Sequence, residues 1–98
     1  MSVTSNTVDG ICKIKIAGRF DFSLHQAFRG AYERVEGSES YEIDMAATSY
    51  LDSSALGMLL LLRDFAGGDT AKVSIINAND DIKKILKISN FEQLFQVG

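Results

Sequence analysis

The chain has 98 residues and a hydrophobic content of 46%, which suggests one domain with a single packed core. Its net charge is −3 and its lysines and arginines are scattered, which argues against nucleic acid as the main ligand. The single cysteine, Cys12, excludes an internal disulfide and a cysteine-built metal site. The N-terminus lacks the signal-peptide pattern, and no apolar run approaches the ~20 residues of a membrane span. We therefore expect a cytoplasmic domain over residues 1–98, without membrane insertion.

A β-hairpin is predicted at the N-terminus. Residues 3–8 form a short strand, and Asp9 and Gly10 make a two-residue turn, because both residue types tolerate the positive φ that such turns need. Residues 11–17 form a second strand, in which apolar residues alternate with lysines. One covered face and one exposed face indicate a sheet with helices on a single side. The apolar face carries Cys12, Ile14 and Ile16, and the polar face carries Lys13 and Lys15.

A helix and a third strand are predicted next. Residues 18–22 form a connection, and Ser23 opens the helix, with Gln26 three residues later in a capping box. Gly37 suits the C-terminal end of this helix, and residues 41–45 alternate as the third strand. The buried stripe of the helix is predicted to hold Leu24, Ala27, Phe28, Ala31 and Val35.

The second half of the chain is predicted to contain a parallel crossover. Its helix covers residues 54–65, is capped by Asp52 or Ser53, and is ended by residues 67–69. Residues 72–76 form a fourth strand, and the order of strand, helix and strand predicts a right-handed connection.

A last helix and strand complete the prediction. Asn79 caps the helix, in which acidic residues precede lysines, the order that complements the helix dipole. Asn90 suits a left-handed helix end, and residues 94–97 form a short strand. The buried face of the helix is predicted to hold Ile82, Ile85, Leu86 and Ser89.

The helix over residues 54–65 is apolar on more than one side. At ~100° per residue, one broad face packs on the sheet, whereas Leu56 and Leu60 lie off that face and Leu61 flanks it. A neighbouring helix covers these leucines, or a few exposed leucines carry no meaning, or they form a partner surface that runs down from Ser53. A homodimer would use them equally well. The broad face comprises Ala55, Met58, Leu59, Leu62, Phe65 and Ala66.

Ser53 is the leading candidate for a functional side chain. It stands at a helix start, where unpaired N–H groups and partial positive charge stabilise a phosphate. The alternative is a helix cap with no further role, worth ~1 kcal/mol. Nucleophilic catalysis is disfavoured, because the Gly-x-Ser-x-Gly elbow is missing and the only histidine, His25, is expected on a solvated helix face. We therefore expect neither an enzyme nor a cofactor.

Two aspartates lie in loops that follow predicted strands. Asp21 follows the second strand and Asp52 the third, so both loops can open at the same end of the sheet. They are either a carboxylate pair or two solvated loop residues. A metal site here is weakly supported, since no further ligand cluster is apparent and no metal is expected.

Several motifs together resemble a known family. They are residues 18–21 (Gly-Arg-Phe-Asp), residues 52–57 (Asp-Ser-Ser-Ala-Leu-Gly), residues 73–76, and residues 85–91 leading to Leu94 and Phe95. With these motifs the chain resembles a STAS domain of the anti-sigma factor antagonist type over nearly its whole length. The resemblance implies a small α/β fold, with a mixed β-sheet of four to five strands and helices packed mainly on one face.

The resemblance also implies a partner switch. In such proteins the first serine of the motif, here Ser53, is phosphorylated by a cognate serine kinase that is often itself the anti-sigma factor, and a PP2C-type phosphatase reverses the reaction. The unmodified form binds its partner and the phosphorylated form does not. The alternative is a constitutive STAS subunit of an ABC-type transporter complex without a phosphorylation cycle. The expected partner surface comprises Asp21, Asp52, Ser54, Leu56, Gly57 and Leu60.

Overall fold

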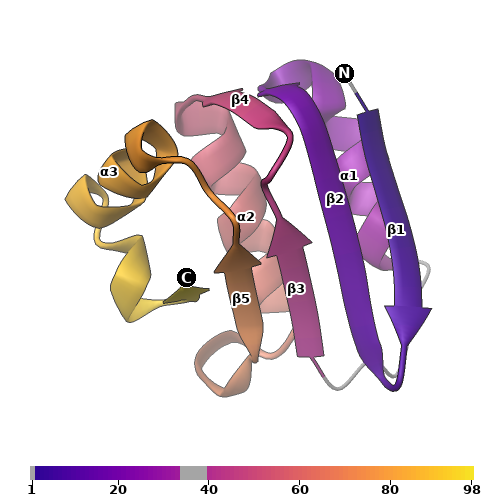
Figure 1. Ribbon diagram of the computed structural model, residues 1–98. Helices are drawn as coiled ribbons and strands as arrows, with labels where there is room; N and C mark the ends of the chain where they lie inside the picture. Colours follow the sequence, from indigo (N-terminus) through magenta and orange to yellow (C-terminus); the bar gives the residue numbers. More distant parts are fainter. Residues whose placement is uncertain (1, 34–39) are drawn as a thin grey trace.

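The computed structural model describes residues 2–33 and 40–98 (Figure 1). The predicted helix positions Val35 and Gly37 lie outside these residues. In chain order the elements are β1 (Ser2–Val8), β2 (Ile11–Phe20), α1 (His25–Glu33), β3 (Ser40–Asp44), β4 (Thr48–Leu51), α2 (Ser53–Phe65), β5 (Val73–Ile76), α3 (Asp80–Ile88) and β6 (Gln96–Val97). Single 3₁₀ turns lie at Phe22–Leu24, Gly68–Thr70 and Phe91–Gln93.

The strands form one mixed sheet in the order β1-β2-β3-β5-β6, with β4 pairing only with β2. β1 runs antiparallel to β2, and the other pairs are parallel. The predicted α/β class with a mixed sheet is confirmed. The sheet has six strands rather than four to five, because β4 was not predicted.

The hairpin forms as predicted. Asp9 and Gly10 have φ values of 52° and 80°, and Val8 pairs with Ile11 on either side of the turn. A turn with positive φ at both central residues matches the right-handed twist of the flanking strands.

β2 is longer than predicted, because residues 18–20 continue the strand instead of forming a connection. Its first part pairs with β3, and its last three residues pair with β4 after a register shift between Gly18 and Arg19. Gly18 has a φ of 87°, which a residue without Cβ adopts at little cost. The buried hydroxyl of Thr48 donates to the Ile16 carbonyl at 2.7 Å and fixes β4 on this part of β2.

The start of α1 also differs from the prediction. Asp21, not Ser23, is the capping residue, and it caps a 3₁₀ turn that precedes α1. The Asp21 carboxylate accepts from the Ser23 amide at 3.0 Å, so Ser23 is itself a donor to the cap and does not form the capping box with Gln26. Of the expected stripe, Leu24, Phe28 and Ala31 are buried, whereas Ala27 is exposed and Tyr32 is buried in addition.

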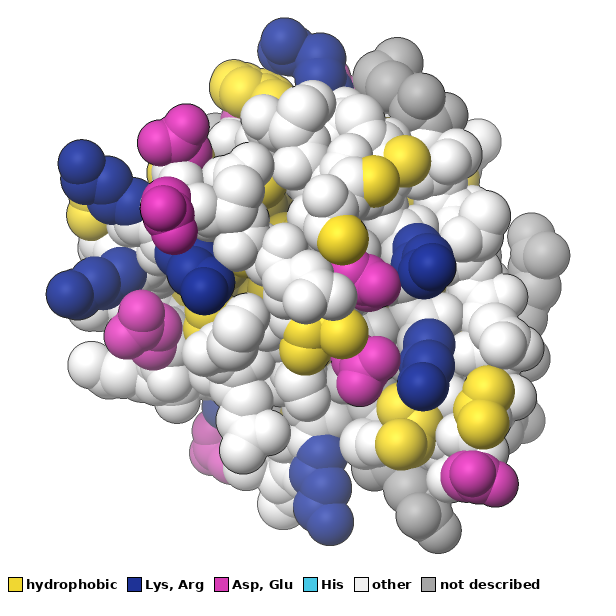
Figure 2. Space-filling model, in the orientation of Figure 1, with side chains coloured by type: hydrophobic (Ala, Val, Ile, Leu, Met, Phe, Trp, Pro, Cys, Tyr) yellow, Lys and Arg dark blue, Asp and Glu magenta, His cyan; other side chains and the backbone are white. Residues whose placement is uncertain are grey.

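Helices α1 and α2 lie behind the sheet in Figure 1, and α3 lies beyond β5. Cys12, Ile14 and Ile16 are at most 1% exposed on the covered face. Lys13 and Lys15 are exposed on the other face, in register with Glu42 and Asp44 of β3, and Figure 2 shows basic and acidic side chains interspersed there. The predicted one-sided helical layer over β2 is thus confirmed.

The predictions for the last helix are confirmed, and that for the last strand holds in part. The Asn79 side chain accepts from the Ile82 amide at 2.9 Å and caps α3, and Asn90 has a φ of 60°. Ile82 and Leu86 are buried, and Ile85 packs against the core. β6 is shorter than the predicted strand, because residues 91–93 form a 3₁₀ turn. Within the described residues, no helix is long and apolar enough to cross a membrane.

Candidate functional site

The end of the β2–β4 pair positions the candidate site. Phe20 pairs with Leu51 in this parallel pair, so the residues that follow them, Asp21 and Asp52, leave the sheet at the same end. The two loops predicted to open together therefore do so. β4 places Asp52 beside the end of β2. This strand was not predicted, because residues 46–51 were expected to form a connection between β3 and α2.

Asp52 is the N-cap of α2. Its Oδ1 accepts the Ala55 amide at 3.0 Å and the Ser54 hydroxyl at 2.6 Å. These hydrogen bonds hold the pKa of Asp52 below its ordinary value, against a smaller upward effect of the Asp21 charge. The start of α2 thus stabilises the charged form of Asp52 against the opposing effects of burial and of the Asp21 charge.

Ser53 and Ser54 have different environments. Ser54 is half-buried, and its hydroxyl is engaged by Asp52. Ser53, the first residue of α2, is exposed, and within the described part of the chain its hydroxyl makes no hydrogen bond. The two adjacent serines could not be separated by composition alone, and the structure leaves only the first of them open to solvent.

Asp21 is held by its own loop. The Ser23 side chain and amide both donate to its Oδ1, and Arg19 Nε lies 3.6 Å from its Oδ2. The hydrogen bonds from Ser23, with a smaller contribution from Arg19, lower the pKa of the Asp21 carboxyl. Asp21 is therefore an ionised and partly exposed carboxylate, at the same end of the sheet as the start of α2.

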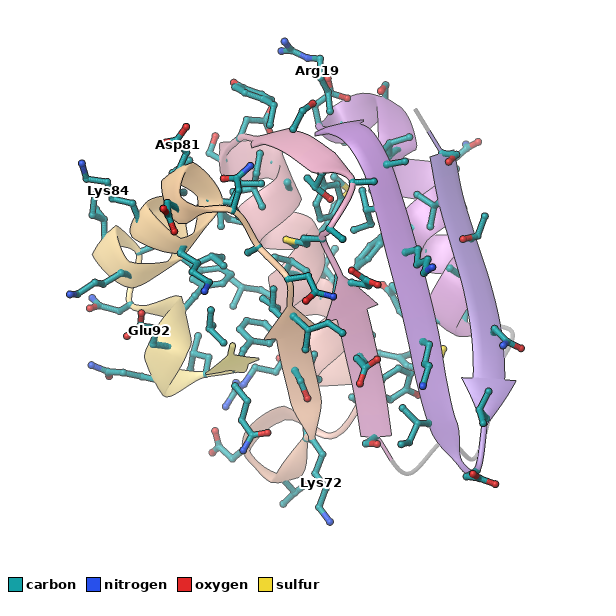
Figure 3. The ribbon with its side chains drawn as sticks, viewed as in Figure 1. Arg19, Lys72, Asp81, Lys84 and Glu92 are labelled. Atoms are coloured by element: carbon teal, nitrogen blue, oxygen red, sulfur yellow. The ribbon has the colours of Figure 1, made fainter. Side chains whose placement is uncertain are left out.

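Two aromatic contacts near the site were not predicted. The Arg19 guanidinium lies 4.2 Å from the centre of the Tyr50 ring, its register partner on β4, and Figure 3 shows Arg19 projecting from this end of the sheet. Phe22 is 66% exposed and stacks on His25 with ring centres 5.0 Å apart. His25 is thus half-buried, contrary to the solvated position expected for it. No sequence signal pointed to the Arg19–Tyr50 pair, because it depends on the register of an unpredicted strand.

The exposed side of α2 continues from Ser53. Leu56 is half-buried and packs against the core, Gly57 is exposed, and Leu60 is 37% exposed. Leu61 is 52% exposed. Cover by a neighbouring helix therefore does not hold for Leu60 and Leu61, whereas Leu56 is covered in part. Exposed leucines without a role and a partner surface both agree with this exposure.

Phe65 on the predicted broad face of α2 is only partly covered. It is 45% exposed, and its ring packs edge-on against the ring of Tyr32 in α1, with ring centres 5.1 Å apart. The four residues that complete the packing of this face, each at most 4% exposed, are Ala55, Met58, Leu59 and Leu62.

The two carboxylates have no partners that would complete a metal site. Among residues 2–33 and 40–98, no group of three or more His, Cys, Asp or Glu side chains is arranged to hold an ion. The site is therefore an exposed hydroxyl at a helix start, flanked by two ionised carboxylates and by exposed apolar side chains. Such a surface suits the binding of another protein.

Comparisons with known proteins identify the family. The family described as "Mlab, STAS domain" matches residues 4–96, and the chain therefore belongs to the STAS domain family. It is 59% identical to a STAS-domain containing protein of Pseudomonas aeruginosa (strain UCBPP-PA14). The alignment spans 86 residues and covers 87% of this chain and 85% of the relative.

Solved structures share the fold at low identity. The anti-sigma factor antagonist SpoIIAA in its unphosphorylated form matches with a TM-score of 0.75 at 15% identity, covering 99% of this chain and 87% of that one. Its phosphorylated form, described as a Bacillus cell fate determinant, matches with a TM-score of 0.70 at 14% identity, covering 99% and 91%. A sulfate transporter family protein of Wolinella succinogenes matches with a TM-score of 0.76 at 14% identity, covering 93% and 80%. The predicted membership of the STAS domain family is confirmed by the family match over residues 4–96, and the solved structures confirm the fold.

Proposed function

We propose that this STAS domain is a phosphorylation-controlled partner-switching regulator of the anti-sigma factor antagonist type. Residues 1–98 act as one cytoplasmic binding unit, not as an enzyme, and Ser53 is the phosphoacceptor. The observation that carries the proposal is the exposed Ser53 hydroxyl at the start of α2, beside an engaged and half-buried Ser54. A kinase requires such an accessible hydroxyl.

The helix start accounts for tolerance of the phosphate. The first N–H groups of α2 and its positive dipole end favour an anion at this position. The cap of α2 is the Asp52 carboxylate, which accepts from the Ala55 amide, and not the Ser53 hydroxyl, so a phosphate on Ser53 leaves the cap in place. No global rearrangement is required.

The flanking carboxylates account for release of the partner. A phosphate adds about −1.5 to −2 charges next to Asp21 and Asp52, which are already ionised. A partner surface that fits a neutral hydroxyl between two aspartates loses affinity from repulsion and desolvation, and ~1.4 kcal/mol already corresponds to tenfold. Ser54, Leu56, Gly57 and Leu60 complete the proposed contact surface. The partner is a serine kinase of the anti-sigma type, and a PP2C-type phosphatase restores binding.

The second candidate is a constitutive STAS subunit of an ABC-type transporter. The sulfate transporter family protein among the structural matches supports it, because a STAS fold occurs there under a transport name. In that case Ser53 is only the first residue of α2. The two functions differ in a single observable, phosphate on Ser53.

The test is phosphorylation of matched serine variants. Wild-type protein incubated with ATP and an extract of the source cells should gain the mass of one phosphate. Ser53→Ala should show no gain, whereas Ser54→Ala, one residue away, should be modified like the wild type. Modification of Ser53→Ala to the wild-type level would overturn the acceptor assignment. No modification of any variant by an extract that labels a known STAS substrate would favour the transporter subunit.

A further inference from the structure

Strand β1 has one edge that pairs with no described strand. It is the terminal strand of the sheet, bonded only to β2, and it forms the outer edge of the sheet in Figure 1. Of its seven residues only Val3 is half-buried, and the others are exposed. A free edge presents N–H and C=O groups that can pair with another chain.

Natural proteins protect such edges, and among residues 2–33 and 40–98 β1 carries none of the usual protection. Its sequence, SVTSNTV, contains no charge, proline or glycine, and its pairing with β2 has no bulge. Valine and threonine, which favour strands, make up most of it. At the opposite end of the sheet β6 is only two residues long, and a very short edge strand is itself a protection. Of the two outermost strands of the sheet, β1 is therefore the one that lacks this protection.

The hairpin determines which groups of β1 point outward. Val8 and Ile11 flank a two-residue turn, so they are a hydrogen-bonded pair. Hydrogen-bonded and non-hydrogen-bonded pairs alternate along an antiparallel ladder. Residues 2, 4, 6 and 8 therefore direct their N–H and C=O groups to β2, and Val3, Ser5 and Thr7 direct theirs away from the sheet.

We propose that β1 pairs antiparallel with β1 of a second copy, around a two-fold axis at Ser5. In this register Ser5 faces Ser5 of the second copy, and Val3 faces Thr7. All three outward residues of each copy then form hydrogen-bonded pairs, about six bonds in total. The two sheets join into one continuous sheet with a closed, isologous contact.

The strand is self-complementary in charge as well as in hydrogen bonding. Facing β1 strands bring no like charges together, because β1 has none. The nearest lysines, Lys13 and Lys15, belong to β2, and the two β2 strands would lie three strand spacings apart, about 14 Å, beyond the Debye length of about 8 Å in physiological salt.

The dimer leaves the Ser53 surface open. Ser53 follows β4, which pairs with the side of β2 opposite to β1. The proposal is therefore independent of the proposed function. A contact of one seven-residue strand is smaller than a standard interface, so we expect weak association, with a Kd on the order of 100 µM.

Sedimentation equilibrium over a concentration range that spans this value tests the dimer. Ser5→Lys or Ser5→Glu places two like charges on the axis, and each variant alone should remain monomeric, with the Kd weakened at least tenfold. An equimolar mixture of the two should form a heterodimer at least as tight as the wild-type dimer. Gln96→Lys and Gln96→Glu, which add the same charges at the β6 edge, should associate like the wild type.

Amide hydrogen exchange of the wild-type protein gives a second test that requires no variant. Val3, Ser5 and Thr7 should exchange more slowly at high than at low protein concentration, and Thr4 and Asn6 should be insensitive. A monomeric wild type at millimolar concentration, a dimer that persists in Ser5→Lys, or a mixture that stays monomeric would each overturn the proposal. A persisting dimer would point to the exposed leucines of α2.

Discussion

The Asp52 carboxylate has a capping role and a charge, and two substitutions separate them. Asp52→Ala removes the acceptor of the Ala55 amide and of the Ser54 hydroxyl. Loss of an N-cap costs about 1 kcal/mol, with a range of about 0.5–2, and a hydrogen bond adds about 0.5–1.5. The expected loss is therefore about 1–3 kcal/mol. For a domain of this size the Tm should fall by about 5–20 °C.

Asp52→Asn keeps an oxygen at the same place and removes only the charge. Asparagine caps helices about as well as aspartate, and the lost attraction of the charge to the helix dipole is about 0.3–1 kcal/mol. Relief of repulsion with Asp21 offsets part of that loss. We therefore expect Asp52→Asn to melt within a few degrees of the wild type.

Thermal unfolding followed by circular dichroism measures both variants. Asp81→Asn is the matched control, because it removes the same charge from the exposed first turn of α3 without removing its cap, Asn79. The reasoning is refuted if Asp52→Asn melts as low as Asp52→Ala, since the charge and not the acceptor would then hold α2. A stable Asp52→Asn variant that binds the partner tenfold more weakly would assign the carboxylate to the contact surface.

Three further predictions concern stability. Gly57→Ala should raise the free energy of unfolding by about 0.5–1 kcal/mol, because the added Cβ would meet no atom within 4 Å and alanine favours the helix. A denaturant titration measures this change, and a lower free energy of unfolding would contradict the open space found at Gly57. Thr48→Val should cost about 1–3 kcal/mol in the same titration, because the Ile16 carbonyl loses its buried donor, and an unchanged midpoint would mean that β4 does not depend on this bond. The lowered pKa values of Asp21 and Asp52 should stabilise the fold fully above their ordinary value of 3.8 and progressively less as pH falls through the lowered values, so acid unfolding of Asp52→Asn should depend less on pH than that of the wild type.

The elements that were predicted well depend on residues close together in the chain. The Asp9–Gly10 turn and the Asn79 cap each follow from side chains that act within a few residues. The alternation in β2 identified its buried face for the same reason, because every second residue of a strand shares a face. The motifs around Asp21 and Ser53, with the supporting pattern of the later strand and helix, predicted the STAS family, and the match over residues 4–96 confirms it.

The missed strand and the contact built on it depend on pairing between distant segments. β4 has only four residues, and it is a strand because β2 continues past Gly18 to meet it. The capping box at Ser23 was wrong because the Asp21 carboxylate, held beside Arg19, is a competing and stronger acceptor. The Arg19–Tyr50 contact has no local signature, because it depends on the register of β2 and β4, whereas the stacking of Phe22 on His25 is a local contact that the predicted polar helix face did not include.

By itself the amino-acid sequence determined the fold class, the family and the candidate serine, because alternation, caps and turns act over a few residues and a motif is a local string. Tertiary structure alone decided that Asp21 and Asp52 lie at one end of the sheet and that Ser53 rather than Ser54 faces solvent. The physical reason is that register and exposure arise from contacts between segments about thirty residues apart, such as Ile16 and Thr48, which no short-range pattern specifies.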